Sequence, residues 1–318
     1  MMSGSVLIDG IDVFDSWGAV MLRGSDAQLL RLPERKVQES VSYYEVSGED
    51  VDLEDIVLQA SDVELSFDLR STSATTLMRN LDAFYSRLSA PGYRNIYVRT
   101  LSRTFELRYL SSTTVDQRGA LSKSGVKNIV INVRFAIDNY NQMLDDTYSE
   151  PTDPDTRYTY VKLDGKDLAS YGITVRGVYT TALQLPARKP PLTAVSLSQS
   201  GGYADLMTQA TLEAYDVVIS CSMRCDNISQ YYNHISALFA RMCKTSLLDL
   251  ALTAAGKNYS CYYVRQQDVI KQRAFDPGVA LQFDIVLRST DYELLSYLLG
   301  SESLQAIMTE DEKLLIIS

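Results

Sequence analysis

The sequence predicts a β-rich α+β fold in which two tandem copies of one domain follow each other along 318 residues. Three observations lead to this prediction. LRLPERK at 30–36 and LQLPARK at 183–189 share the pattern Leu-x-Leu-Pro-x-Arg-Lys, 153 positions apart. Most apolar residues in each copy alternate with polar ones, which is the period of a half-buried strand. One further segment in each copy has the period of an amphipathic helix.

Neighbouring sequence follows the repeated motif at an offset that shifts by no more than about two residues in the following matches. Asp9-Gly10 matches Asp164-Gly165, Trp17-Gly18 matches Tyr171-Gly172, and DVELSFDLR at 62–70 matches DVVISCSMR at 216–224. A chance match of seven residues would not be accompanied by further matches in the flanking sequence. We therefore interpret the chain as a tandem duplication, because repeats of this kind determine the architecture.

The repeat register divides the chain into four parts. Copy 1 is expected at 1–138 and copy 2 at 159–290. The stretch 139–158 between them is rich in Asp, Asn, Thr and Pro, which is typical of a linker. Residues 291–318 are expected to add a C-terminal extension with a short amphipathic helix and a strand. A chain of this length exceeds what one hydrophobic core supports, so two domains agree with its size.

Strands are predicted in the same order in both copies. In copy 1, residues 62–70 alternate apolar and polar side chains, residues 96–109 form a hairpin with a turn near Ser102-Arg103, and 129–135 form a closing strand. The corresponding segments of copy 2 are 219–223, 259–263 and 283–287. The alternation predicts antiparallel strands with one buried and one exposed face.

A single helix is predicted in each copy. Leu77, Leu81, Phe84 and Leu88 recur at three- and four-residue spacing, Ser and Thr residues precede them as candidate caps, and Pro91-Gly92 follows as a stop signal. The equivalent apolar positions in copy 2 are Ile228, Ile235, Leu238 and Met242. Each copy should therefore be a set of antiparallel strands with one helix packed on them.

Bulk composition narrows the functional class. The net charge is −10, with 30 basic and 40 acidic residues, and proteins that bind nucleic acid by sequence depend on Lys and Arg to neutralise phosphates. No apolar stretch approaches the roughly 20 residues that cross a bilayer. The N-terminal residues lack the basic and apolar regions of a secretion signal, so synthesis in the cytoplasm is expected.

Catalytic and metal-binding patterns are sparse in this sequence. The one histidine, His234, lies in the predicted helix of copy 2, where copy 1 has Asn80, so triads and metal clusters that need histidine are disfavoured. The densest acidic cluster lies in a polar loop and is interpreted as solvated surface or, less often, as a weak calcium site; its members are Asp50, Asp52, Glu54 and Asp55. We expect no enzymatic activity, cofactor or metal.

Cysteine usage argues against a disulfide framework. All four cysteines, Cys221, Cys225, Cys243 and Cys261, lie in copy 2, and copy 1 has none. A fold that forms without cysteine does not need it, so we expect free buried thiols that act as small apolar residues.

The order of features in copy 1 resembles the N-terminal domain of distal tail proteins of long-tailed bacteriophages. The resemblance consists of a turn with glycine, the loop YYEVSGEDVDLED, the strand DVELSFDLRS, the helix LMRNLDAFYSRL, and then a hairpin and a closing strand. SGGYADL and DVVISCSM follow the same order in copy 2. The resemblance implies a fold related to phage tail-tube proteins: a β-sandwich or partly closed barrel with one flanking helix.

The same resemblance implies a structural role in the tail of a phage or prophage virion, as a distal tail or hub protein. Such domains form rings at the junction between tail tube and baseplate, so the expected partners are copies of the chain itself, tail-tube proteins, and baseplate or tail-fibre proteins. Six chains could form the ring, with their second domains stacked or outward, and this arrangement is favoured. Alternatively, three chains could supply two domains each and give pseudo-six-fold symmetry.

Under this hypothesis the polar stretches 43–55 and 196–207 are mobile loops or projecting hairpins that contact adjacent subunits or rings. Deletion of 45–54 should then abolish assembly and leave the domain folded. The candidate interface residues are Tyr43, Tyr44, Val46, Gly48, Asp52 and Leu53 in the first stretch, and Gly201, Gly202, Tyr203 and Leu206 in the second.

Two other classes were weighed. A duplicated carbohydrate- or protein-binding module would gain avidity from two sites, but Trp17 and Tyr171, both before glycine, fit a packed turn better than an open stacking platform. A hydrolase that uses carboxylates should have matching acid pairs. Asp52 matches Asp205, whereas Glu54 and Asp55 meet Met207 and Thr208.

Overall fold

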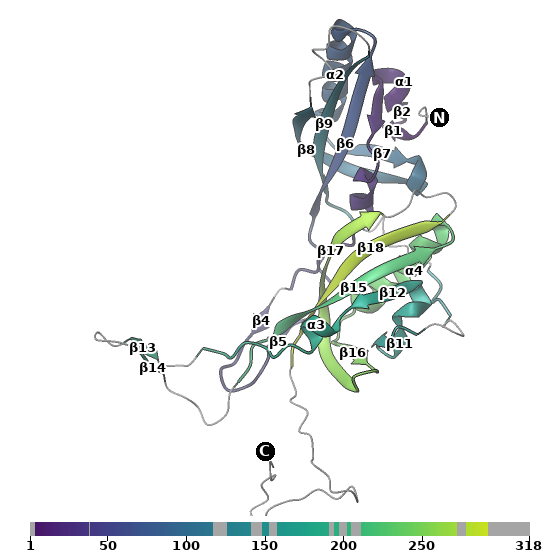
Figure 1. The fold of residues 1–318 in the computed structure, drawn as a ribbon. Helices are drawn as coiled ribbons and strands as arrows, with labels where there is room; N and C mark the ends of the chain where they lie inside the picture. The colour runs from purple at the N-terminus through teal and green to yellow at the C-terminus, as the bar shows by residue number, and fades with distance from the viewer. Residues whose placement is uncertain are drawn as a thin grey trace, which may run out of the picture.

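A computed structural model describes residues 4–37, 39–116, 126–140, 148–152, 158–190, 194–196, 202–204, 211–271 and 278–291. Two β-rich halves follow each other in space, and the first half lies above the second in Figure 1. The extension expected at 291–318 lies outside the described residues beyond Asp291, as does most of the expected linker. None of the described helices is long and apolar enough to cross a membrane.

The first half contains a seven-stranded antiparallel sheet in the order β2-β1-β7-β8-β9-β6-β3. Its strands are β1 (Val6–Ile8), β2 (Ile11–Asp12), β3 (Ala19–Met21), β6 (Ser61–Ser71), β7 (Arg94–Val98), β8 (Arg103–Asp116) and β9 (Lys127–Ile137). Its helices are α1 (Val13–Trp17), α2 (Ala74–Leu88) and the short 3-10 turns η1 (Ser25–Leu30) and η2 (Arg99–Leu101). The hairpin and the two long strands predicted for copy 1 are confirmed.

The second half contains another seven-stranded sheet in the order β11-β10-β16-β17-β18-β15-β12. Its strands are β10 (Val161–Leu163), β11 (Lys166–Asp167), β12 (Ile173–Gly177), β15 (Tyr215–Cys225), β16 (Leu248–Leu252), β17 (Lys257–Lys271) and β18 (Val279–Ser289). Its helices are η4 (Leu168–Tyr171), α3 (Tyr179–Ala182) and α4 (Ile228–Met242). Strand for strand, this is the order of the first sheet.

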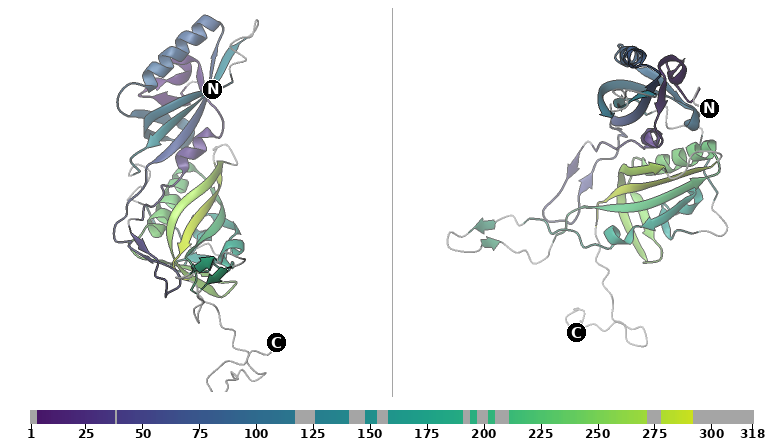
Figure 2. Two further views of the ribbon diagram at one scale, coloured as in Figure 1. Left: turned by 90° about the vertical axis from the view of Figure 1, so that its left-hand side faces the viewer. Right: turned by 45° about the horizontal axis from the view of Figure 1, so that its top comes forward.

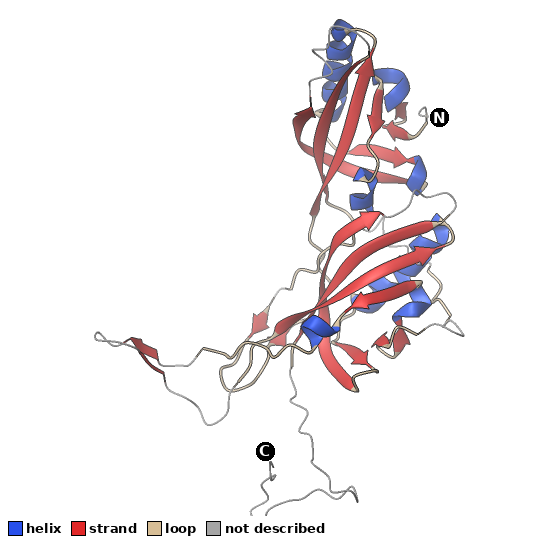
Figure 3. Ribbon diagram, in the orientation of Figure 1, coloured by secondary structure: helices blue, strands red, loops and turns tan. Residues whose placement is uncertain are grey.

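Each half has one bent seven-stranded sheet where a β-sandwich or partly closed barrel was expected, and the described strands form no closed barrel (Figure 3). The long strand β8 pairs with β7 through residues 103–107 and with β9 through residues 108–116, with a register shift between Tyr109 and Ser111. The strand β17 does the same, with a shift between Tyr263 and Arg265. Bulges of this kind bend and twist a strand, so one continuous strand joins both parts of each sheet.

The predicted flanking helices are confirmed, and each covers one face of its sheet. Ser73 caps α2 by accepting a hydrogen bond from the Thr76 amide (3.1 Å), and Asn227 caps α4 in the same way through the Gln230 amide (2.8 Å). The predicted apolar positions of α2 are buried. Of those in α4, three are buried and Ile228 is partly buried at the N-terminal end.

The turns that open each half also match. Asp9-Gly10 and Asp164-Gly165 have positive φ at both residues, which a two-residue hairpin turn requires. Asp9 accepts a hydrogen bond from the Asn95 amide and Asp164 one from the Asp249 amide, at 2.8 and 2.9 Å. Identical side-chain chemistry therefore fixes the same turn to the same neighbouring strand in both halves.

Trp17-Gly18 and Tyr171-Gly172 form a second pair of matched turns. Both aromatic side chains are buried, and both glycines end a helical turn in the left-handed conformation, with φ of 66° and 73°. A Cβ on either glycine would collide with a carbonyl oxygen of the adjacent long strand, that of Arg70 or Arg224. The interpretation of this position as a packed turn is confirmed.

A β-hairpin arm leaves each half at the same place. Isolated bridges between Arg35 and Leu58 and between Arg188 and Leu212 form the two bases. The first arm, residues 35–58, contains β4 (Ser40–Val41) and β5 (Asp50–Val51); the second arm, residues 188–212, contains β13 (Ala194–Ser196) and β14 (Gly202–Ala204). The first arm lies along the second half, whereas β13 and β14 project away from both sheets (Figures 1 and 2).

We predict that Gly18→Ala and Gly172→Ala each lower the free energy of unfolding by at least about 2 kcal/mol, because a left-handed alanine is strained and its Cβ meets a strand carbonyl. Urea denaturation measures this loss. Gly177→Ala is the matched control, since Gly177 has ordinary φ and open space at its Cβ, and its effect should stay within about 1 kcal/mol. Equal effects at all three positions would contradict the assignment.

The four cysteines are free and buried, as expected from their usage. Burial raises the pKa of the Cys243 thiol to about 11 and that of Cys225 to about 12, so at neutral pH both remain protonated and poorly nucleophilic. We predict that a maleimide reagent at pH 7 labels native protein at least about 100-fold more slowly than urea-unfolded protein. Fast labelling of the native state would show that this core opens readily.

Candidate functional site: the docked arm

The base of the first arm is held by Arg35, the arginine of the first Leu-x-Leu-Pro-x-Arg-Lys motif. Its backbone amide donates to the carbonyl of Val264 in β17 (2.8 Å). Its guanidinium donates through Nη1 to the Lys244 carbonyl (2.7 Å) and through Nη2 to the Leu53 carbonyl (2.9 Å). One buried side chain thus ties the arm to itself and to the second half.

The bend of the first arm is held by Lys189, the lysine of the second motif. Its ammonium group donates to the carbonyl oxygens of Tyr43 (2.7 Å), Val46 (2.6 Å) and Gly48 (2.7 Å). An ammonium group has three donors, and all three are used. A buried cation is tolerated when it is fully hydrogen-bonded, so the arm completes the site of this lysine.

Gly48 brings the arm close to the end of β18. Its amide donates to the Leu212 carbonyl (2.8 Å), and the Glu49 amide donates to the Thr290 carbonyl (3.1 Å). Gly48 has a φ of 82°, and a Cβ there would overlap the Thr290 carbonyl. Only glycine allows the two backbones to approach this closely.

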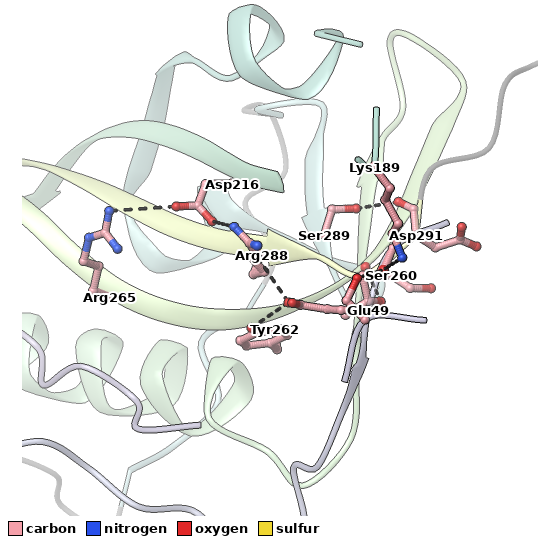
Figure 4. A network of polar contacts seen from close by, with 12 residues as sticks. Glu49, Lys189, Asp216, Ser260, Tyr262, Arg265, Arg288, Ser289 and Asp291 are labelled. Atoms are coloured by element: carbon pink, nitrogen blue, oxygen red, sulfur yellow. Dashed lines mark hydrogen bonds and ion pairs between the residues drawn. The ribbon is translucent and has the colours of Figure 1, made fainter. Parts of the chain in front are cut away.

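A polar network anchors Glu49 on the second half (Figure 4). The carboxylate of Glu49 accepts from the Tyr262 hydroxyl (3.0 Å) and from Arg288 (3.2 Å). Arg288 also pairs with Asp216 (3.1 Å), which lies 3.9 Å from Arg265. Burial, followed by the charge of Glu49, raises the pKa of Tyr262, so Tyr262 remains a hydrogen-bond donor at all physiological pH values.

The apolar part of the first motif is buried at the same junction. The Leu30 carbonyl accepts from the Tyr231 hydroxyl (3.2 Å), the Leu32 amide donates to Gln266 Oε1 (2.7 Å), and the Pro33 carbonyl accepts from the Tyr263 hydroxyl (2.9 Å). These partners belong to α4 and β17 of the second half. Their side chains are buried, with Gln266 and Tyr263 within 1% of full burial.

A third group of contacts lies beside the motif. Tyr232 donates its hydroxyl to the Leu101 carbonyl (3.0 Å), and the Arg103 guanidinium lies 4.6 Å from the Tyr232 ring centre. Lys271 pairs with the buried Asp26 at 2.6 Å. The contacts described here that join the two halves link residues about 130 to 245 positions apart in sequence. The two halves are therefore joined by a specific polar and apolar junction.

The predicted interface residues of the first arm lie at or beside this junction, and those of the second arm lie away from it. Gly48 and Leu53 are buried, Tyr44 is half-buried, and Tyr43, Val46 and Asp52 are exposed. In the second arm Gly202 and Tyr203 belong to the backbone of β14, and Tyr203 is paired with Val195. Gly201 and Leu206 lie outside the described residues. Arg35 and Lys189 were not among the predicted site residues, although the repeated motif that contains them is the signal that marks them.

Other candidates from the sequence have ordinary surroundings. His234 is half-buried on α4, with Nδ1 3.9 Å from the Cys225 sulfur. Asp50, Asp52 and Glu54 line an open cavity of about 420 Å³ beside residues 245–247. Among the described residues, no group of three or more His, Cys, Asp or Glu side chains could hold a metal ion.

No family model matches this chain, and no curated protein matches it significantly. Among solved structures, it is similar to the crystal structure of the SPP1 Dit (gp 19.1) protein, described as a paradigm of hub adsorption apparatus in Gram-positive infecting phages. The similarity covers 90% of this chain and 98% of that chain, with 12% sequence identity and a TM-score of 0.30.

We predict that Lys189→Met lowers the free energy of unfolding by about 3 kcal/mol, because it leaves buried carbonyl groups without their donor. Urea denaturation of monomeric protein measures the loss, and hydrogen exchange should show faster opening of residues 43–49. Lys36→Met is the matched control, since Lys36 occupies the same motif position but is exposed; its effect should stay below about 0.5 kcal/mol. Similar losses for both variants would contradict the assignment.

Proposed function

We propose that this chain is a structural subunit of a phage or prophage tail and forms a ring at the junction of tail tube and baseplate. One observation carries the proposal. The arm of the first half docks on the second half, and the equivalent arm of the second half projects away from both sheets. A contact between unlike surfaces of equivalent units is head-to-tail, and its repetition closes a ring when the rotation between units allows.

The two halves are proposed to descend from one ring-forming domain by tandem duplication. The identical strand order supports this origin, as do the matched turns at Asp9-Gly10 and Asp164-Gly165 and the matched arm bases. Such a duplication converts a contact between two chains into a contact within one chain. The junction between the halves would then be the internal copy of the ring contact.

Three chains, each supplying two units, are the ring order that we propose. The docked first arm supports this order over six chains with outward second halves, because it makes the halves successive neighbours. The long strands of the second sheet also run obliquely to those of the first in Figure 1. A turn between successive units is what closure requires, whereas parallel units would extend as a straight filament.

The phage-tail context of the ring rests on the sequence resemblance of copy 1 to distal tail proteins. The net charge of −10 fits a ring through which DNA passes without being held. The rival role of a carbohydrate-binding module has less support: Trp17 and Tyr171 are buried, and neither can stack on a sugar.

We predict that the purified chain forms a closed species of three times its 35.6 kDa mass, visible by negative-stain imaging as a ring with an open channel. Light scattering over a range of concentrations measures the mass. Deletion of 45–54 should abolish the ring, because the deleted segment includes three of the residues that hold the halves together (Val46, Gly48 and Glu49). Circular dichroism should still show folded sheets.

A chain that stays monomeric at every concentration, or a ring that survives this deletion, would contradict the proposal. A ring of six masses would support a tail ring and refute the three-chain order.

A further inference from the structure

We propose that the second copy of the motif, with the arm that follows it, docks on the first half of another copy of this chain, with Leu183, Leu185 and Arg188 as the anchor and Lys36 as the receptor. The inference rests on the proposed function, because it names the surfaces through which the ring would close. It is argued from the opposite environments of the two copies of the Leu-x-Leu-Pro-x-Arg-Lys motif.

The charged residues of the motif have reciprocal environments. In the first copy Arg35 is 5% exposed and Lys36 is exposed; in the second copy Arg188 is exposed and Lys189 is 7% exposed. Arg35 is buried because its own arm docks on the following half, and Lys189 is buried because it receives the arm of the preceding half. Lys36 has no preceding half within the chain, and Arg188 has no following one.

The leucines of the motif show the same difference. Leu30 and Leu32 are 1% and 2% exposed, whereas Leu183 and Leu185 are 46% and 59% exposed. Burying a leucine side chain contributes about 2 kcal/mol, and two exposed leucines just before one proline form an apolar surface that favours a protein partner. In the first copy of the motif the second half of the chain covers this surface. A half of another copy of this chain is therefore the partner that fits the second copy of the motif.

The difference in exposure does not come from the local fold. Lys36 donates its amide to the Val57 carbonyl (2.8 Å), and Lys189 donates its amide to the Thr211 carbonyl (2.9 Å). The next rung is also shared, between Gln59 and Glu34 (2.9 Å) and between Glu213 and Ala187 (2.8 Å). The bases of both arms are therefore held in the same backbone frame, and the two copies differ in whether a neighbouring half covers them.

The first half presents a surface equivalent to the one that receives the first arm. The bulge of β17 offers the Val264 carbonyl to Arg35, and the equivalent bulge of β8 lies between Tyr109 and Ser111, with Leu110 at its centre. Leu110 is exposed. Met78 on α2 is also exposed at the position equivalent to Tyr232 of α4, which contacts the preceding half. The first half therefore exposes Leu110 and Met78 at positions equivalent to those that the second half uses to contact the first.

The contact between chains should be weaker than the contact within the chain. Glu49, which pairs with Tyr262 and Arg288, has Gly202 at the matching position of the second arm, so this pair is not repeated. The anchor leucines, Arg188 and Lys36 remain. The chain should therefore keep its first arm docked while its copies associate and separate.

The test uses two variants of the full chain, each defective on one side. Leu183→Asp with Leu185→Asp removes the anchor, and Lys36→Glu removes the receptor. Val126→Asp is the control, since Val126 is 62% exposed just before β9, whose first residue pairs with the end of β6 that is remote from the first arm. All altered residues are exposed, so thermal unfolding of each monomer should match that of the unaltered monomer.

Each defective variant should associate on the order of 100-fold more weakly than the unaltered chain, because central contacts dominate such interfaces. Mixed in equal amounts, the two should form a dimer and nothing larger. The receptor variant still has a working anchor and the anchor variant a working receptor, so exactly one of the possible contacts between chains survives. Light scattering distinguishes this dimer from monomers and rings.

If the unaltered chain forms rings and either variant forms them equally well, the inference is overturned and the proposed function stands. A mixture that remains monomeric would also overturn the head-to-tail pairing of these surfaces. An unaltered chain that never associates would refute the proposed function together with the inference. Rings lost in the Val126→Asp control would show that the effect is not specific to the two surfaces.

Discussion

The buried ammonium group of Lys189 and the three carbonyl groups around it form the interaction on which the arrangement of the two halves depends. A cation in this position is costly without full hydrogen bonding. Its partners come from an arm that starts more than 140 residues earlier. The second half therefore has a satisfied interior only when the first arm is in place, and Arg35 imposes the same condition from the other side of the junction.

This dependence is one part of a wider junction between the two halves. Their buried apolar residues form one continuous cluster, and η1 of the first half packs against β17 of the second. An open sheet with one helix on one face leaves apolar surface that needs a further layer. In the second half the motif segment around Leu30 and Leu32 helps to supply that layer.

A head-to-tail contact between two equivalent units leaves one contact surface unused on each unit. The contact uses one surface of each unit as anchor and another as receptor, so two joined units always retain one unused surface of each kind. In the proposed ring these are the second arm and the Lys36 side of the first half. In that ring the contact within the chain is permanent and the contact between chains depends on concentration, which suits a subunit that folds as a monomer and then assembles.

The sequence by itself determined the local structure. Alternation of apolar residues predicted the long strands, and three- and four-residue spacing predicted α2 and α4. The Asp-Gly pairs and the aromatic-Gly pairs marked the turns. Each of these signals acts over a few neighbouring residues. The repeat register also predicted that both halves would share one order of elements. It even marked the motif that carries the junction.

Only the tertiary structure decided what that motif does. Arg35 and Lys189 contact partners up to about 230 residues away, and no local pattern encodes which lysine of the two copies of the motif becomes buried. The bend of each sheet likewise depends on long strands that pair with strands distant in sequence. The two copies differ in burial because one has a neighbouring half in the chain on its arginine side and the other on its lysine side.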